Sequence, residues 1–275
     1  MVWRIKYLGR YKEIKMVARM KAIPAEETEL DLDLTDFSTK TPETICAVLK
    51  EIPATIIHLN LHYVDFGKIT AADLAVVLAL LSPTVSSLNL GWIGVSFLFT
   101  DAWVTAVSAI NRDILSLSLA GNDLSRFGAG GLARIIKALP PGLKVLNLDW
   151  NDLSKISRKE LNEAFKLLPV GLQTLSLSGN GLNLMSINEL AALGQSLPKT
   201  IKTLDLSDNN FDRDTAMRIF AVLSTFDVQC YFNCIIPHAK RLSAFGLFQS
   251  RPALDISKVS AILVDGPSSS AIGMI

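Results

Sequence analysis

Pairs of leucines separated by one polar residue recur along the chain at a constant interval. Every step between pairs is 29 residues. The first leucines of the seven pairs are Leu30, Leu59, Leu88, Leu117, Leu146, Leu175 and Leu204. An alternation of this length predicts a short strand whose two leucines face the same, buried side.

A second apolar pattern follows most of these strands, with spacing i, i+3, i+4 and i+7. This spacing predicts a helix with one buried stripe. It is clearest at Ile45, Val48, Leu49, Ile52; Leu74, Val77, Leu78, Leu81; Leu132, Ile135, Ile136, Leu139; Leu161, Ala164, Phe165, Leu168; and Ile219, Val222, Leu223, Phe226. Ser157-x-x-Glu160 and Ser186-x-x-Glu189 predict capping boxes at two helix starts. Prolines after the helices predict where they end.

A unit of strand, loop and helix in 29 residues is too small to bury its own apolar face. Seven such units must therefore stack on one another, which predicts an α/β solenoid with parallel strands on its concave face and helices on its convex face. We assign residues 27–229 to the seven repeats, 1–26 to an N-terminal basic cap segment, and 230–275 to a C-terminal cap and flexible tail.

Asparagines form a second column with the same period, in the turn after each strand of the last four units. They are Asn122, Asn151, Asn180 and Asn209. A buried amide at this place can bond to backbone groups that the turn leaves unpaired, and neighbouring units would continue the ladder. Thr35, Val64 and Ile93 take its place in the first three units, where we expect the ladder to be interrupted.

The first 26 residues are basic, and aromatic residues lie among the cations. The cations are Arg4, Lys6, Arg10, Lys12, Lys15, Arg19 and Lys21, and they face only Glu13. The open end of a solenoid needs covering, so a cap is the first interpretation. A segment attracted to an anionic membrane surface is the alternative. The pattern leaves open whether it forms a helix or a short hairpin about Gly9.

Composition excludes several classes of protein. The formal net charge of +1 argues against a nucleic-acid-binding protein. Three cysteines without paired spacing do not form a disulfide framework. The sequence shows no signal peptide and no apolar run long enough to span a bilayer. We expect a protein that is a monomer when free and that needs no cofactor and no metal.

The units Leu172–Leu182 and Ile201–Phe211 carry a resemblance to a known family. They resemble the ribonuclease-inhibitor-like class of leucine-rich repeats, which implies a right-handed horseshoe. The segment Ala22-Ile-Pro-Ala25, which leads into the first repeat, and the later units are similar to repeats of Legionella-type secreted effectors. The segment Gly128-Ala-Gly-Gly-Leu-Ala133 is similar to GALA repeats. The resemblance implies type IV secretion into the host cytosol, directed by the tail at 266–275.

One column on the predicted concave face is unexpectedly aromatic. Two positions after the second leucine, it runs Leu34, Tyr63, Trp92, Gly121, Trp150, Gly179 and Asp208. The core needs no large residue there, and adjacent strands lie about 4.8 Å apart, so Tyr63 and Trp92 should be neighbours. Exposed rings with open space over the glycines predict a protein-binding site. In the alternative interpretation the rings only shield the sheet.

Polar residues on the same face complete the predicted site. They are Asp31, Asp33, His58, His62, Asn89, Asn147, Asp149, Asp205 and Asp208. The carboxylates favour a partner with a basic surface and would repel phosphates; a solvated face is the alternative. His58 and His62 are candidates for a pair of metal ligands, but the sequence offers no evident third ligand.

The sequence holds no motif that indicates an enzyme. It has no glycine-rich phosphate loop, HExxH or GxSxG. We expect Cys230 and Cys234 to be buried cap residues and the apolar segment Val95–Phe99 to pack under a loop on the convex side. The leading hypothesis is a bacterial effector that binds a host protein or another effector, and that acts as an inhibitor if it covers an active site. The alternative is an adaptor that recruits substrates to a ubiquitin ligase, although neither end of the chain is long enough for a ligase domain or an F-box.

Overall fold

The strands of the protein form one parallel sheet. The computed structural model describes residues 2–5, 8–67, 69–93, 99–223 and 228–232. Within them nine strands follow one another in chain order across the sheet. They are β1 Val2–Arg4, β2 Glu29–Asp31, β3 His58–Asn60, β4 Ser87–Asn89, β5 Ser116–Ser118, β6 Val145–Asn147, β7 Thr174–Ser176, β8 Thr203–Asp205 and β9 Gln229–Tyr231.

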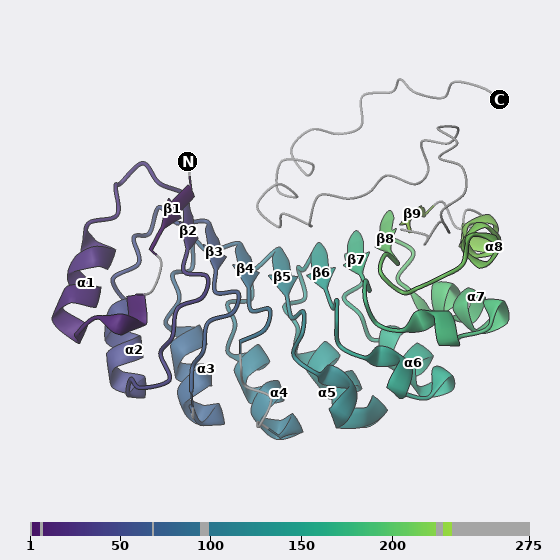
Figure 1. The fold of residues 1–275 in the computed structure, drawn as a ribbon, viewed down its shortest axis with the longest axis horizontal. Helices are drawn as coiled ribbons and strands as arrows, with labels where there is room; N and C mark the ends of the chain where they lie inside the picture. The colour runs from purple at the N-terminus through teal and green to yellow at the C-terminus, as the bar shows by residue number, and fades with distance from the viewer. Residues whose placement is uncertain (1, 6–7, 68, 94–98, 224–227, 233–275) are drawn as a thin grey trace.

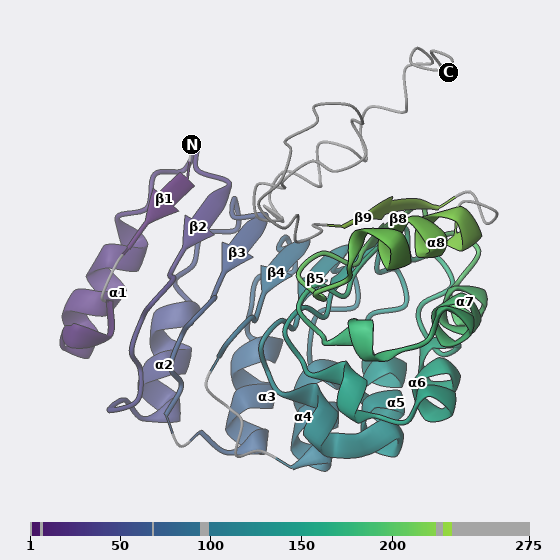
Figure 2. The same ribbon diagram turned by 45° about the vertical axis from the view of Figure 1, so that its right-hand side comes forward.

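The helices lie on the outside of the curve and the strands line the inside (Figure 1). The α-helices are α1 Glu13–Lys21, α2 Pro42–Leu49, α3 Ala71–Ala79, α4 Thr100–Ser108, α5 Gly128–Ala138, α6 Arg158–Phe165, α7 Ile187–Ser196 and α8 Arg213–Leu223. Single 3-10 turns are η1 Leu8–Arg10, η2 Leu124–Phe127, η3 Leu153–Lys155 and η4 Leu182–Leu184. Seen from a second direction, each helix again lies beside the next along the array (Figure 2). This is the solenoid that the 29-residue period predicts.

The leucines of successive units pair directly across the sheet. Leu30 is opposite Leu59, Leu117 is opposite Leu146, and Leu146 is opposite Leu175. These side chains are almost fully buried between the sheet and the helix layer. The helical stripes fill the other side of the same core: for example, Leu161 and Phe165 of α6 are fully buried there. Because each unit contacts mainly its two neighbours, the core runs continuously along the array.

The asparagine column forms the expected ladder. Asn151 Oδ1 accepts hydrogen bonds from the backbone N–H of Asn122 and of Leu124, both at 3.1 Å. Its Nδ2 donates to the carbonyls of Leu119 and Leu148 at 3.0 Å. Asn180 and Asn209 repeat these contacts one unit further along. The ladder therefore links the turns of neighbouring units through buried amides.

The ladder is interrupted where the asparagines are absent, as the sequence predicts, although the Ile93 N–H of the third unit still donates to Asn122 Oδ1 at 3.4 Å. Backbone contacts take the place of the ladder in the first two units. Asp65 N–H donates to the Thr35 carbonyl at 2.9 Å, and Phe37 N–H donates to the Asp65 carbonyl at 2.7 Å. Phe37 and Phe66 pack beneath, with ring centroids 6.1 Å apart. Among the described residues, the buried Thr35 hydroxyl has no hydrogen-bond partner. A threonine is too short to reach the backbone of the adjacent turn.

The N-terminal segment extends the array by one strand and one helix. β1 runs parallel to β2, with Trp3 opposite Leu30. A hairpin about Gly9 is therefore wrong, because that residue lies in η1 between β1 and α1. Met16 and Met20 of α1 are fully buried. The hydroxyl of Thr44, in the first turn of α2, donates to Glu13 at 2.8 Å.

Two helix starts differ in their capping. Ser186 and Glu189 form the predicted capping box at α7. At α6 the box is not formed, because the Ser157 hydroxyl bonds to the Glu160 carboxylate and caps no backbone N–H. Cys230 is buried on β9, as predicted. Phe226, Cys234, 95–98 and the tail at 266–275 lie outside the described residues. Phe99, the described end of the apolar segment Val95–Phe99, is 84% exposed, so the expectation that it packs under a loop is wrong.

Candidate protein-binding site

The turns after β2 to β8 share one position whose backbone conformation is left-handed. The residues at this position have φ between +53° and +66°: Leu34, Tyr63, Trp92, Gly121, Trp150, Gly179 and Asp208. Glycine adopts this conformation without strain, whereas a residue with a side chain costs roughly 1–2 kcal/mol there. The aromatic column of the sequence is therefore a column of left-handed turn residues.

Four bulky members of this column, which we call the exposed row, stand out from the surface. Leu34 is 51% exposed, Tyr63 45%, Trp92 38% and Trp150 50%. Tyr63 and Trp92 are stacked, with ring centroids 5.6 Å apart and 25° between the planes. His62 meets Tyr63 edge to face at 4.3 Å. The strand spacing thus brings the two rings together, as expected.

The space over the glycines is not open, which corrects one expectation from the sequence. A Cβ atom added to Gly121 would lie 2.1 Å from Cε2 of Trp92. One added to Gly179 would lie 2.4 Å from Cδ2 of Trp150. Each tryptophan therefore lies against the glycine of the next turn. The glycines let the rings approach the backbone closely, and both tryptophans still remain partly exposed, 38% for Trp92 and 50% for Trp150.

The polar residues between the two leucines have a structural role that the sequence analysis missed. The five that are Asp or Asn each accept a hydrogen bond from the backbone N–H two residues later: Asp31 from Asp33, Asn60 from His62, Asn89 from Gly91, Asn147 from Asp149, and Asp205 from Ser207. These are Asx turns, which close the strand end. The repeated Asp, Asn or Ser at this position was the signal that could have revealed them.

Two of the predicted partner-binding residues are inaccessible. Asn147 is 8% exposed and Asp205 is 1% exposed. Their prediction as contact residues is wrong, because both side chains are buried. Asp31 and Asn89, at the same position in other units, are only half-buried.

Carboxylates lie at both ends of the exposed row. Near Leu34, Asp33 Oδ1 lies 3.3 Å from His62 Nδ1, and Asp31 pairs with Arg4 at 3.1 Å. Beyond Trp150, Asp149 Oδ1 accepts from the Ser178 N–H at 2.8 Å. Asp208 accepts from the Ser178 hydroxyl at 3.1 Å. Hydrogen bonds thus fix these carboxylates in place beside the row.

The two histidines do not form part of a metal cluster. His62 is held between Asp33 and Tyr63 in the turn after β3, and His58 is half-buried at the start of that strand. Within the part of the chain that the structure describes, no group of three or more His, Cys, Asp or Glu side chains is placed to hold a metal ion.

Cys230 is not poised as a nucleophile. Burial raises the pKa of its thiol from 9.0 to about 12. Burial also raises the pKa of the Cys46 thiol. Because the thiolate is the reactive form, both side chains are protonated at neutral pH.

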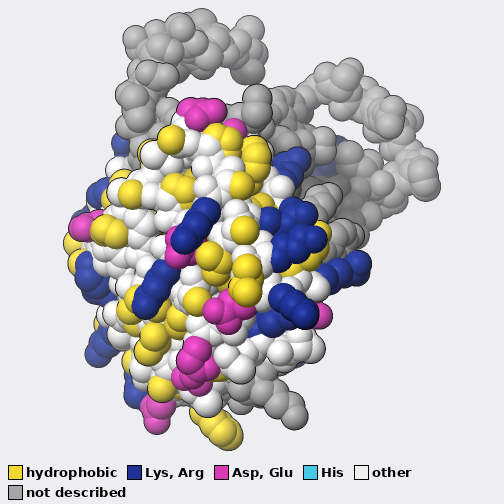
Figure 3. Space-filling model, turned by 90° about the vertical axis from the view of Figure 1, so that its left-hand side faces the viewer, with side chains coloured by type: hydrophobic (Ala, Val, Ile, Leu, Met, Phe, Trp, Pro, Cys, Tyr) yellow, Lys and Arg dark blue, Asp and Glu magenta, His cyan; other side chains and the backbone are white. Residues whose placement is uncertain are grey.

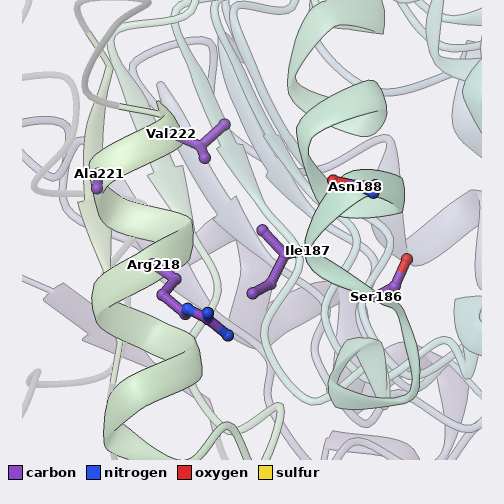
Figure 4. A pocket seen from close by; sticks show the side chains of 6 residues that line it. All are labelled: Ser186, Ile187, Asn188, Arg218, Ala221 and Val222. Atoms are coloured by element: carbon purple, nitrogen blue, oxygen red, sulfur yellow. The ribbon is translucent and has the colours of Figure 1, made fainter.

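A cavity of about 520 Å³ lies on the helix side of the array, between α7 and α8. Its lining residues are Ser186, Ile187, Asn188, Arg218, Ala221 and Val222 (Figure 4). Arg218 and Ile187 approach each other across the gap between the two helices. Among the described residues that line it, Arg218 is the only charged one, so the cavity brings no acid and base together. None of the residues that line the cavity belongs to the exposed row.

Comparison with known proteins identifies the fold. No family model matches the chain, and no curated protein matches it. Among solved structures, the leucine-rich repeat-containing protein LegL7 from Legionella pneumophila superposes with a TM-score of 0.73. The two are 26% identical over 84% of this chain and 74% of that chain. This chain has the leucine-rich-repeat fold. The resemblance to Legionella repeat proteins that its sequence carries is thereby confirmed.

A second solved structure is similar only at a low level. The putative copper homeostasis protein CutC from Streptococcus agalactiae gives a TM-score of 0.31 at 12% identity, over 84% of this chain and 98% of that one. This value is too low to bear on fold or function. With the leucine-rich-repeat fold, the chain has the open, curved sheet that repeat arrays use as a binding surface, which supports a protein-interaction module. None of its described helices has the length and apolar character needed to cross a membrane.

Proposed function

We propose that the protein binds one folded protein partner through the exposed row and the carboxylates beside it. The observation that supports this proposal is the row itself. Leu34, Tyr63, Trp92 and Trp150 are exposed and occupy backbone positions that favour glycine. Side chains that the core does not need and the backbone disfavours are expected where function selects them.

Gly121 and Gly179 supply the internal comparison. They occupy the same turn position with the same sign of φ, so the fold accepts glycine there. The large residues at the other turns are therefore not required for the turn. Tyrosine and tryptophan are the residues that most often dominate binding energy at protein interfaces, because they bury much area with few rotatable bonds.

The proposed partner is basic where it meets the ends of the row. Asp33 and Asp31 lie at one end and Asp149 and Asp208 at the other, and each is fixed by hydrogen bonds. Fixed carboxylates favour a surface that carries lysine or arginine and disfavour phosphates. Folded proteins meet this requirement better than nucleic acids.

The likeness to a Legionella protein supports a more specific role. We infer that the chain is a bacterial effector that is secreted into the host cytosol and binds a host protein or another effector there. If its partner is an enzyme whose active site meets the exposed row, binding would inhibit that enzyme. A translocation reporter fused to the full chain tests export, independently of the binding proposal.

The binding test compares variants that keep the turn geometry. The double variant Trp92→Gly, Trp150→Gly has glycine at both turns. Gly121 and Gly179 already show that glycine fits this turn position. Phe99→Ala is the matched control, because Phe99 is an aromatic residue, 84% exposed, outside the row. Proteins captured from host lysate by the unchanged chain are identified, and their affinities for all three chains are measured.

We expect the double variant to weaken binding by at least 100-fold, on the order of 3 kcal/mol, and the control to bind normally. Equal affinity of the double variant for every captured partner would exclude the row as the binding site. Capture of a ligase subunit that is lost on deletion of residues 1–25 would favour the adaptor hypothesis instead.

A further inference from the structure

The outer face of α1 lies at the end of the array that the described residues form. α1 lies at the start of the array, next to α2 (Figure 1). Met16 and Met20 turn inward and are fully buried. On the opposite side of the helix, Ile14, Ala18 and Ala22 are exposed at successive i, i+4 positions, and Ile14 is 85% exposed. A short apolar ridge therefore projects from this end.

Cations flank the ridge. Viewed from this end, lysine and arginine side chains gather beside apolar ones (Figure 3). Lys21 pairs with Glu51 of the adjacent unit at 3.6 Å. Lys12, Lys15 and Arg19 are exposed, and among the described residues none of the three forms an ion pair with a carboxylate. These three positive charges are therefore exposed to solvent and are not neutralised by a described carboxylate.

Tyr11 holds two of these cations together. Lys15 Nζ lies 4.6 Å and the Arg19 guanidinium carbon 4.4 Å from the centre of its ring. Arg19 also donates to the Tyr11 hydroxyl at 3.1 Å. Two like charges four residues apart on a helix repel each other, and the ring offsets this repulsion by cation–π attraction. The cluster is a preformed pair of positive groups at the margin of the ridge.

We propose that this end of the protein docks on an anionic lipid bilayer. The ridge of Ile14, Ala18 and Ala22 would enter the headgroup region, and Lys12, Lys15 and Arg19 would contact lipid phosphates and carboxylates. An apolar edge bordered by cations is the arrangement with which interfacial helices bind such surfaces. The exposed row lies on the concave side, so the protein can hold a partner while it is on the membrane.

A nucleic acid fits this surface less well. Binding of single strands requires aromatic rings that are free to stack on bases, and the Tyr11 ring is already covered by Lys15 and Arg19. A duplex would gain nothing from the exposed Ile14. The combination of a projecting apolar side chain with flanking cations favours lipid.

The test is co-sedimentation of the full chain with vesicles of phosphatidylcholine alone or mixed with phosphatidylserine. Lys15→Gln with Arg19→Gln removes two cations from the end surface. Lys159→Gln with Lys166→Gln is the matched control, since it removes the same charge from α6 and the residue after it. Ile14→Ser tests the ridge separately. Unfolding temperatures of all variants show whether each is folded.

We expect binding only to the phosphatidylserine vesicles. Each cation near such a surface strengthens binding about fivefold, so Lys15→Gln with Arg19→Gln should weaken it about 25-fold. The control should bind as the unchanged chain does, and Ile14→Ser should weaken binding even in high salt. No binding to either vesicle, or equal loss in the control, would overturn the proposal. So would displacement of the bound chain by a short duplex of DNA added at the same charge concentration.

Discussion

At the scale of single residues, the left-handed turn position explains the contrast between bulky and glycine members of one column. Trp92 extends along the array and covers the backbone at Gly121, and Trp150 does the same at Gly179. A tryptophan in one unit is therefore coupled to a glycine in the next. Such coupling makes the effects of two substitutions non-additive.

Gly121→Ala tests this coupling. The new Cβ would meet the Trp92 ring and would also be strained at φ +64°. We expect a loss of about 2–3 kcal/mol in the free energy of unfolding, measured by urea denaturation. With Trp92→Gly in the background, the loss should fall to about 1 kcal/mol, because only the backbone strain remains.

Trp150→Gly provides the control for this prediction, since it removes an equivalent ring from a different turn. It should leave the cost of Gly121→Ala unchanged. An equal cost of Gly121→Ala in all three backgrounds would show that Trp92 does not lie on the glycine in solution.

At the scale of elements, the two halves of the array close their turns in different ways. The units from Leu117 onward use buried asparagines, whereas the first units use backbone bonds around Asp65 and leave the Thr35 hydroxyl unpaired. A buried polar group stabilises only when it is bonded. Substitutions in the two halves of this column should therefore change the free energy of unfolding with opposite signs.

Asn151→Ala should destabilise the protein by about 3 kcal/mol, because two buried backbone N–H groups lose their acceptor. Thr35→Val, at the equivalent position, should be neutral or stabilise by about 1 kcal/mol, since it removes an unsatisfied hydroxyl. Chemical denaturation of both variants checks the pair. Destabilisation of similar size in the two would contradict the ladder as the source of the difference.

The predictable part of the structure is the part fixed by periodicity. Leucine pairs and helical stripes recur because every unit must bury the same face, so the strands, the helices and the asparagine ladder followed from the sequence. β1 did not, because Trp3 occupies the place of a leucine there. The burial of Asp205 and Asn147 did not either, because residues of the same type at the same repeat position, Asp31 and Asn89, are only half-buried. The left-handed φ at Trp92 was hidden as well, since glycine, its usual signal, is absent.

At the scale of the whole molecule, stability should vary along the array. Units that contact only their neighbours open locally, with free energies set by their own interfaces. We expect backbone amides between Leu117 and Asn209 to exchange with solvent more slowly than those between Leu30 and Ile93. Hydrogen exchange followed by mass spectrometry measures this directly. Asn151→Ala should speed exchange in its own and adjacent units first. Uniform protection across both halves would mean that the array unfolds as one cooperative block.

At the left-handed turn position, the residue that is exposed can vary while the buried residues that define the fold stay the same. Leucine, tyrosine, tryptophan, glycine and aspartate all occupy it in one chain. The scaffold therefore accepts several kinds of residue at this position, and a ring at one turn must be exchanged together with the glycine that it covers at the next. Exchanging a handful of these displayed residues, with every buried position untouched, should redirect the same frame toward a new target. A library varied at this column alone would be a compact source of new binding proteins.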